Sequence, residues 1–272
     1  MFDYKHYVPA IRWRQGEFSA LQELRPNQRR DLTPLVDIPS IPWNFEDDRP
    51  ARSIDQHLNN VPEQMITAWG GNSPLFVDLG QLDGALRMAS GRHPVDDLFE
   101  RLTGEGVHAI PVTATDRDAD YQAAIRLVTG RTGTGACLRA SVDDISDAAS
   151  ISALAEIADE IELDFDDIDL VLDLRSIETS QTSILRTLLG TVLPTFPNIG
   201  AYRSFTLLSG AFPVNLSSVP QGLSLRPRAD WALWLSVLSI PNIRRPAYGD
   251  YTATHPDQEE IDPRIMRVSA SI

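Results

Sequence analysis

Acidic and basic side chains recur where short apolar runs of this chain end. They are Arg12, Arg14, Asp37, Asp78, Arg139, Asp173, Arg175 and Asp250. Carboxylate oxygens are ligands that Mg²⁺ prefers in proteins, and the planar fork of arginine matches the geometry of phosphate. If the fold gathers these side chains at one place, they could bind an anionic ligand or assist the hydrolysis of a phosphate-containing substrate.

Three interpretations are open for this set, so whether the chain is an enzyme is open too. In the first, the four aspartates hold a divalent cation such as Mg²⁺, which polarises a phosphate ester while an aspartate activates water. In the second, no metal takes part: the arginines bind an anionic ligand and the acids hold the guanidinium groups in place. In the third, the charges form a structural salt-bridge network, because buried charges must be paired.

His255 and Tyr248 complete the candidate set. His255 follows the last apolar run and could act as a general acid or base, while Tyr248 precedes Asp250 by two residues and lies on the same side of a strand. No His-Glu-x-x-His or Gly-x-Ser-x-Gly pattern occurs. The candidate catalytic residues are Asp173, Asp250 and His255. The candidate ligand-binding residues are Arg12, Arg14, Asp37, Asp78, Arg139, Arg175 and Tyr248.

Eight apolar runs must position these residues. The runs are 7–13, 34–39, 75–79, 108–113, 136–140, 168–174, 205–211 and 246–251. Helical patterns follow them at 16–32, 53–69, 93–102, 118–127, 144–157, 179–193 and 230–238. Val-, Ile- and Leu-rich strands that alternate with helices favour a parallel sheet, and eight strand–helix units can close into a (β/α)8 barrel of the TIM type. An open doubly wound α/β sheet is the alternative.

The barrel prediction treats residues 1–272 as a single domain with a polar C-terminal tail from about residue 252. In such a barrel the carboxyl ends of all strands meet at one face, where working residues lie. The loop at 38–50 is unusually long and carries Trp43 and Phe45, which could pack over the barrel rim or contact a partner. The glycine-rich segment 130–135 follows a helix and precedes a strand, an order typical of a turn rather than of a phosphate-binding loop.

The charge and composition of the chain argue against a broadly nucleic-acid-binding protein and against a membrane-spanning one. The net charge of −14 argues against broad nucleic-acid binding, which needs a basic field. No apolar run approaches the length of a membrane span, and the N-terminus does not have the form of a signal peptide. The single cysteine, Cys137, lies inside an apolar run and is expected to be a buried hydrophobe. We therefore expect a cytoplasmic protein without a membrane segment.

Short motifs at both ends of the chain indicate a family. The stretches are Tyr-Val-Pro-Ala-Ile-Arg-Trp-Arg at 7–14, Pro-Leu-Val-Asp-Ile at 34–38, the Asp-Trp and Leu-Trp pairs within 228–234, and Tyr-Gly-Asp-Tyr at 248–251 before His-Pro at 255–256. Together they resemble the beta protein family, named after a bacteriophage protein. Position 14 is more typically lysine and position 37 glutamate in such proteins.

The resemblance implies a barrel-type protein of unsettled activity. Such proteins are often encoded in phage or bacterial defence-type gene neighbourhoods, so the resemblance implies antiviral defence and a protein partner in a defence complex. It names no substrate.

Overall fold

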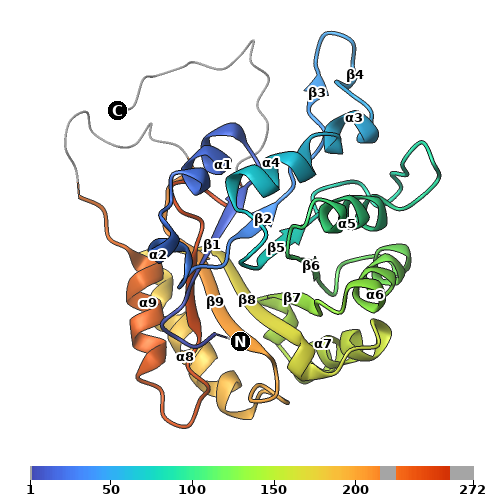
Figure 1. Cartoon of the computed structure of the whole chain (residues 1–272). Coiled ribbons are helices and arrows are strands. Elements are labelled where there is room, and N and C mark those ends of the chain that lie inside the picture. Colours follow the sequence, from blue (N-terminus) through green and yellow to red (C-terminus); the bar gives the residue numbers. More distant parts are fainter. Residues whose placement is uncertain (1, 215–224, 258–272) are drawn as a thin grey trace.

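The computed structural model describes residues 2–214 and 225–257 (Figure 1). The last part of the expected tail, 258–272, and part of the polar connection after the seventh predicted strand, 215–224, lie outside the described residues. Within the described residues, no helix combines the length and the apolar character that crossing a lipid bilayer requires.

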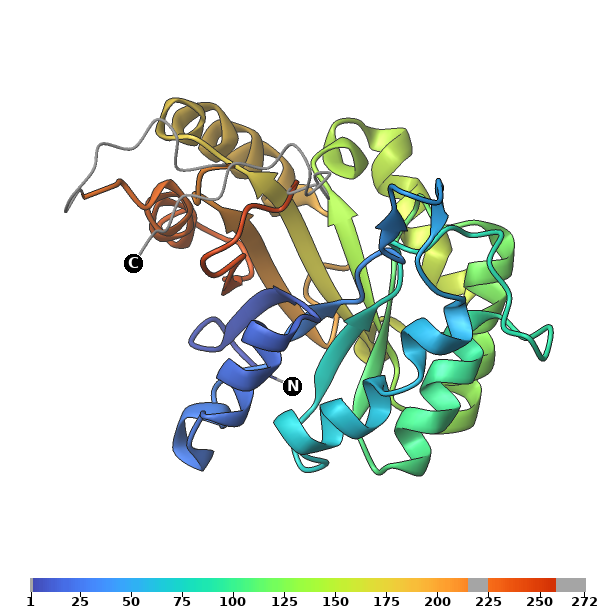
Figure 2. The same cartoon turned by 90° about the horizontal axis from the view of Figure 1, so that it is seen from above.

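Eight parallel strands close into a barrel in the order β1-β10-β9-β8-β7-β6-β5-β2, with helices outside them (Figure 2). The predicted (β/α)8 architecture is therefore confirmed, and the open doubly wound alternative is wrong. Each predicted strand is present with ends that differ by at most a few residues. The strands are β1 (Tyr7–Arg12), β2 (Leu35–Asp37), β5 (Leu75–Asp78), β6 (Ala109–Thr113), β7 (Ala136–Ser141), β8 (Ile168–Ser176), β9 (Ser204–Gly210) and β10 (Ala247–Asp250).

The helices occupy the predicted segments, but two of them are broken. Pro26 begins a separate short helix, and Pro62 lies in the first turn of another, because a proline in a helix interior removes a backbone donor and clashes with the preceding turn. The helices are α1 (Gln15–Gln22), α2 (Pro26–Arg29), α3 (Ile54–Leu58), α4 (Val61–Ala68), α5 (Pro94–Gly104), α6 (Ala119–Thr132), α7 (Ala148–Glu160), α8 (Thr182–Val192) and α9 (Ala229–Leu238). Single 3₁₀ turns occupy Asp143–Ile145, Phe165–Asp167, Thr179–Gln181 and Leu193–Thr195.

The long loop after β2 forms a small antiparallel hairpin of β3 (Trp43–Asn44) and β4 (Arg49–Pro50). The hairpin projects away from the barrel (Figure 1). The side chain of Trp43 stays 43% exposed, while Phe45 is partly buried. The exposure of Trp43 does not fit close packing of that ring over the rim, one of the two alternatives for this loop.

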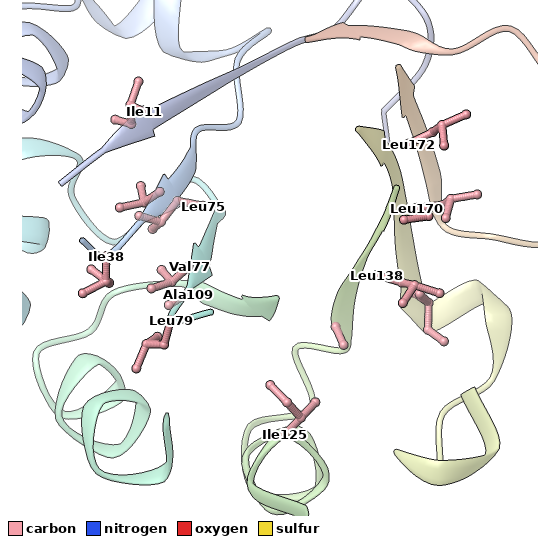
Figure 3. Packing of buried hydrophobic residues seen from close by; sticks show 14 of the residues in the cluster. Ile11, Ile38, Leu75, Val77, Leu79, Ala109, Ile125, Leu138, Leu170 and Leu172 are labelled. Atoms are coloured by element: carbon pink, nitrogen blue, oxygen red, sulfur yellow. The ribbon is translucent and has the colours of Figure 1, made fainter. Parts of the chain in front are cut away.

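Side chains alternate along each strand between the barrel interior and the helix layer. A small inner core includes Val8, Leu35, Phe76 and Cys137, which is fully buried as predicted. A larger outer core lies between strands and helices, and Figure 3 shows part of it. Consecutive residues of a strand therefore contribute in turn to the inner core and to the outer core.

The glycine-rich segment at 130–135 is a helix end and a turn, as predicted. Gly133 caps α6 in the left-handed conformation, with φ of 63°. Gly135 also has a positive φ, of 69°, and a Cβ at this position would lie 2.0 Å from the Asp167 carbonyl oxygen. The turn into β7 therefore requires glycine at position 135.

Replacing Leu138 by alanine should lower the free energy of unfolding by about 2–5 kcal/mol, because its fully buried side chain fills space between β7 and the helix layer. Leu127→Ala is the control: this leucine, on α6, is 54% exposed and should change stability by less than about 0.5 kcal/mol. Urea denaturation followed by circular dichroism measures both. Equal losses would contradict the placement of Leu138 in the core.

Candidate functional site

A cavity of about 860 Å³ opens at the carboxyl ends of the barrel strands. Its walls come from the last residues of β1, β2, β5, β7 and β8, from the loops that follow these strands and β6, and from Pro256 and Asp257. Seven of the ten predicted site residues line it. They are Arg12, Arg14, Asp37, Asp78, Arg139, Asp173 and Arg175.

Strand register explains why residues far apart in sequence meet there. Arg12 pairs with Asp37 across β1 and β2, and Asp37 pairs with Asp78 across β2 and β5. On the opposite side of the ring, Asp173 pairs with Ser141. Arg139 lies two residues before Ser141 and so faces the same side of β7, from where its long side chain reaches across the interior.

Arg139 is the centre of the charged layer. Its Nη1 donates to Asp37 Oδ1 at 2.6 Å and to Asp78 Oδ2 at 2.9 Å, and its Nε donates to Asp173 Oδ2 at 2.9 Å. Its Nη2 donates to the Tyr251 hydroxyl at 2.9 Å, and that hydroxyl in turn donates to Asp173 Oδ2. One guanidinium group therefore holds three carboxylates from three strands, all of them buried.

The environment of these groups shifts their protonation in opposite directions. Burial raises the pKa of Asp37 above its usual value, and the contact with Arg139 only partly offsets this. Burial also acts on Asp78, but Arg117, then Arg139 and the Gly80 backbone N–H at 2.7 Å, outweigh it and leave the Asp78 pKa below its usual value. Burial lowers the pKa of Arg139, but its acidic neighbours, Asp37 foremost, raise it well above the usual value.

A second side of the cavity is cationic. Arg12 and Arg175 both donate from Nη2 to the Pro256 carbonyl oxygen, at 2.9 and 3.1 Å, and Arg175 also pairs with Asp257 at 2.7 Å. Arg14 is exposed and lines the same cavity, and its side chain makes no hydrogen bond or ion pair with other described residues. Burial, followed by the nearby charge of Arg14, lowers the pKa of Arg12.

Arg175 owes its position to an irregularity in β8. The pairing of β8 with β9 shifts between Asp173 and Ser176, and Arg175 has φ of 57°, in the left-handed region. Non-glycine residues rarely adopt this region, and such strain tends to concentrate at functional sites. The irregularity turns the backbone N–H of Arg175 toward Asp173 Oδ1 at 2.8 Å.

Two predicted residues, Asp250 and Tyr248, lie outside the cavity. They face the helix layer, where Arg228 Nη2 donates to Asp250 at 2.8 Å and to Asp230 at 2.7 Å. The Tyr248 hydroxyl donates to Asp230 at 2.8 Å, and Tyr7 donates to Asp250 at 2.6 Å. The structure therefore does not bring Asp250 together with the three aspartates around Arg139.

Alternation along β10 is the physical reason for this separation. The residue that enters the barrel is Tyr251, and its neighbour Asp250 must then point outward. The sequence prediction placed Asp250 at the mouth and therefore missed Tyr251, the next residue, which faces the barrel interior instead. It also missed Arg117, which contacts Asp78 at 3.3 Å, because this residue lies within the loop after β6 and not at the end of the apolar run 108–113.

His255 also lies apart from the main cavity. It is buried and borders a separate hollow of about 620 Å³ together with Ser176, Phe212 and Arg226. Its Nδ1 accepts from the Asp257 backbone N–H at 3.1 Å. The structure thus separates two of the three candidate catalytic residues, Asp250 and His255, from the cavity that Asp173 lines.

The carboxylates surround a guanidinium group rather than a space for a cation. Among the described residues, no group of three or more His, Cys, Asp or Glu side chains is arranged to hold a metal ion. Asp37, Asp78 and Asp173 instead each contact Arg139. Both metal-free interpretations, anion binding by the arginines and a structural salt-bridge network, expect carboxylates paired with arginine in this way.

Comparisons with known proteins give one family and several distant structural likenesses. The family model described as Beta protein matches residues 7–272. No curated protein sequence gives a significant match.

Solved structures similar to this chain include a triosephosphate isomerase from Bartonella henselae, with 10% identity, a TM-score of 0.45, and coverage of 90% of this chain and 92% of that one. An alanine racemase from Clostridium difficile 630 has 10% identity and a TM-score of 0.45, with 93% and 52% covered. A diaminopimelate decarboxylase from Helicobacter pylori has 7% identity and a TM-score of 0.48, with 92% and 57% covered. The chain thus spans little more than half the length of the latter two.

Replacing Arg139 by methionine should destabilise the fold by about 3–5 kcal/mol, because three buried carboxylates lose their shared cation. The matched control is Arg126→Met, which removes an exposed pair with Glu162 at 3.2 Å and should cost less than about 1 kcal/mol. Denaturant unfolding at pH 7 measures both losses. A loss for Arg139→Met no larger than that of the control would contradict the central role of Arg139.

The pH dependence of unfolding should separate Asp37 from Asp78. The pKa of Asp37 is raised, so its contribution to stability is fully present below its unfolded pKa near 3.8 and is lost as the pH rises through the folded pKa. The pKa of Asp78 is lowered, so its contribution is present above 3.8 and is lost as the pH falls through the folded pKa.

Stability relative to Asp37→Asn should therefore rise as the pH falls toward 3.8, whereas stability relative to Asp78→Asn should fall below 3.8. Urea unfolding curves over this pH range give both differences. If both differences change with pH in the same direction, the assignment of opposite shifts is wrong.

Proposed function

This chain belongs to the Beta protein family, and we propose that its barrel binds a small anionic ligand at the carboxyl-terminal mouth. The observation that carries the proposal is the cationic side of the cavity, formed by Arg12, Arg14 and Arg175. Seven aspartates and five arginines line this cavity. Arg117 and Arg139 are paired with aspartates, whereas Arg12 and Arg175 meet at the Pro256 carbonyl oxygen with the charge of Arg14 nearby. Arginine suits such a site because its planar fork forms paired hydrogen bonds with phosphate or carboxylate oxygens.

Arg14 is the residue best placed to contact an incoming anion. Its charge faces the cavity without an ion-pair partner among the described residues, whereas Arg175 is paired with Asp257. An anion at this point would also relieve the repulsion between Arg14 and Arg12. Bringing these like charges together costs stability in the free protein, and ligand binding offsets that cost.

Arg139 has a different role in this proposal. Its donors are already used by Asp37, Asp78, Asp173 and Tyr251, so it positions the layer beneath the ligand rather than binding it. The aspartates then act as the acids that fix the guanidinium geometry. Rigid placement of the supporting layer lowers the ordering cost of binding.

The metal-dependent hydrolase has less support. Its metal was expected on four aspartates, of which Asp250 faces the helix layer and the other three contact Arg139. The protein partner and the role in antiviral defence stay predictions. The exposed Trp43 on the β3–β4 hairpin is the feature that supports a partner, since aromatic anchors are enriched in interfaces.

Replacing Arg14 by alanine should weaken the binding of inorganic pyrophosphate by about tenfold to a hundredfold, the range expected when a hydrogen bond to a charged group is lost. Affinity should also fall with added salt. Isothermal titration calorimetry at low and moderate ionic strength measures both effects.

The control is Arg186→Ala, since Arg186 is exposed on α8 and lies outside the cavity. Because Arg14 is exposed and its charge repels that of Arg12, the Arg14→Ala variant should keep or slightly raise its unfolding temperature. The proposal fails if the wild type does not bind pyrophosphate, or if both variants bind it as the wild type does.

A further inference from the structure

A second hollow of about 630 Å³ adjoins the cationic side of the mouth. It lies between α1, the loop after β2, and the pair α3–α4. Arg14, Pro39 and Ser40 line both this hollow, called the annex below, and the main cavity. A ligand held at Arg14 can therefore extend into the annex.

Aromatic rings form the inner wall of the annex. The rings of Trp13 and Phe18 lie 5.5 Å apart between centroids, tilted by 34°. Trp13 is buried, and its Nε1 donates to Gln64 Oε1 at 3.0 Å, which fixes the orientation of the indole. Ile38 and Val61 add apolar surface beside them. Because Trp13 is buried and Phe18 only partly so, the ring of Phe18 is the part of this wall on which a flat ring could stack.

Polar side chains surround that wall. Gln15 and Arg52 are exposed, line the annex, and make no side-chain hydrogen bond with other described residues. Asn60 also lines it. Its Oδ1 accepts from Asn59 Nδ2 at 2.8 Å, and its own Nδ2 makes no hydrogen bond with other described residues. Amide and guanidinium groups can read the hydrogen-bonding edge of a heterocycle that stacks on an aromatic wall.

We propose that the anionic ligand is a nucleotide, with its phosphate groups on Arg12, Arg14 and Arg175 and its base in the annex against Trp13 and Phe18. The inference rests on the proposed anion-binding function and assigns its ligand class. An inorganic anion uses only the cationic side and leaves the annex unused. An aliphatic phosphate ester gains apolar contact but has no edge for Gln15, Arg52 and Asn60. A base joined to phosphate matches both walls, with Arg14 at the junction.

Calorimetric titration of the full chain compares inorganic pyrophosphate, ribose 5-phosphate and the four nucleoside diphosphates ADP, GDP, CDP and UDP. At least one diphosphate should bind about tenfold more tightly than pyrophosphate, the scale that stacking of one base on an aromatic side chain contributes. Saturation-transfer NMR should then show stronger transfer to the base protons than to the ribose protons.

Two variants separate this inference from the anion-binding proposal. Phe18→Ala should remove most of the advantage of the nucleotide and leave pyrophosphate binding unchanged, whereas Arg14→Ala should weaken both. Phe212→Ala is the matched control, because Phe212 lines neither the mouth nor the annex. Gln15→Ala, at an exposed position, tests the annex without disturbing the packing of Phe18.

The outcomes differ for the two claims. If pyrophosphate binds through Arg14 and no nucleotide binds more tightly, the nucleotide inference is wrong and anion binding stands. If nucleotides bind more tightly but neither Phe18→Ala nor Gln15→Ala reduces that advantage, the base does not occupy the annex and the inference is again overturned. If neither pyrophosphate nor any nucleotide binds, both claims fail.

Discussion

The charged layer at the mouth depends on one guanidinium group inside a ring of strands. Arg139 reaches from β7 to carboxylates on β2, β5 and β8, and so ties opposite sides of the barrel together. Three buried carboxylates without a cation would repel one another and would lose hydration without compensation. Arg139 therefore makes it possible for the upper end of the barrel to be polar, while the lower part is filled by apolar side chains such as Val8 and Phe76.

The fold could be predicted because parallel strands buried on both faces have near-continuous apolar sequences. The helical segments could also be predicted from their periodicity. The breaks before Pro26 and Pro62 follow from the position of each proline, which the periodicity alone does not take into account. Cys137 was predicted to be buried because an apolar run encloses it, and it is. Closure into a barrel followed from the number of strands, since eight strand–helix units meet the requirement for a closed ring.

The candidate site was predictable only in part. The ends of apolar runs located Asp37, Asp78 and Asp173 correctly, because the register aligns strand ends at one level. The same signal could not tell Asp250 from Tyr251, since a shift of one residue exchanges the two faces of a strand. Nor could it find Arg117, whose position depends on the path of a loop and on contacts made across 39 residues of sequence.

The hairpin of β3 and β4 has a mechanical consequence. Its chain enters through Pro39 and Ser40, which stand at the boundary between the mouth and the annex, and His57 Nε2 contacts the Pro39 carbonyl oxygen at 2.8 Å. A macromolecule that displaced the hairpin would also displace Pro39 and Ser40. If such a displacement changed the affinity for a ligand at Pro39 and Ser40, thermodynamic reciprocity would require that ligand to change the affinity of the hairpin for the macromolecule by the same factor.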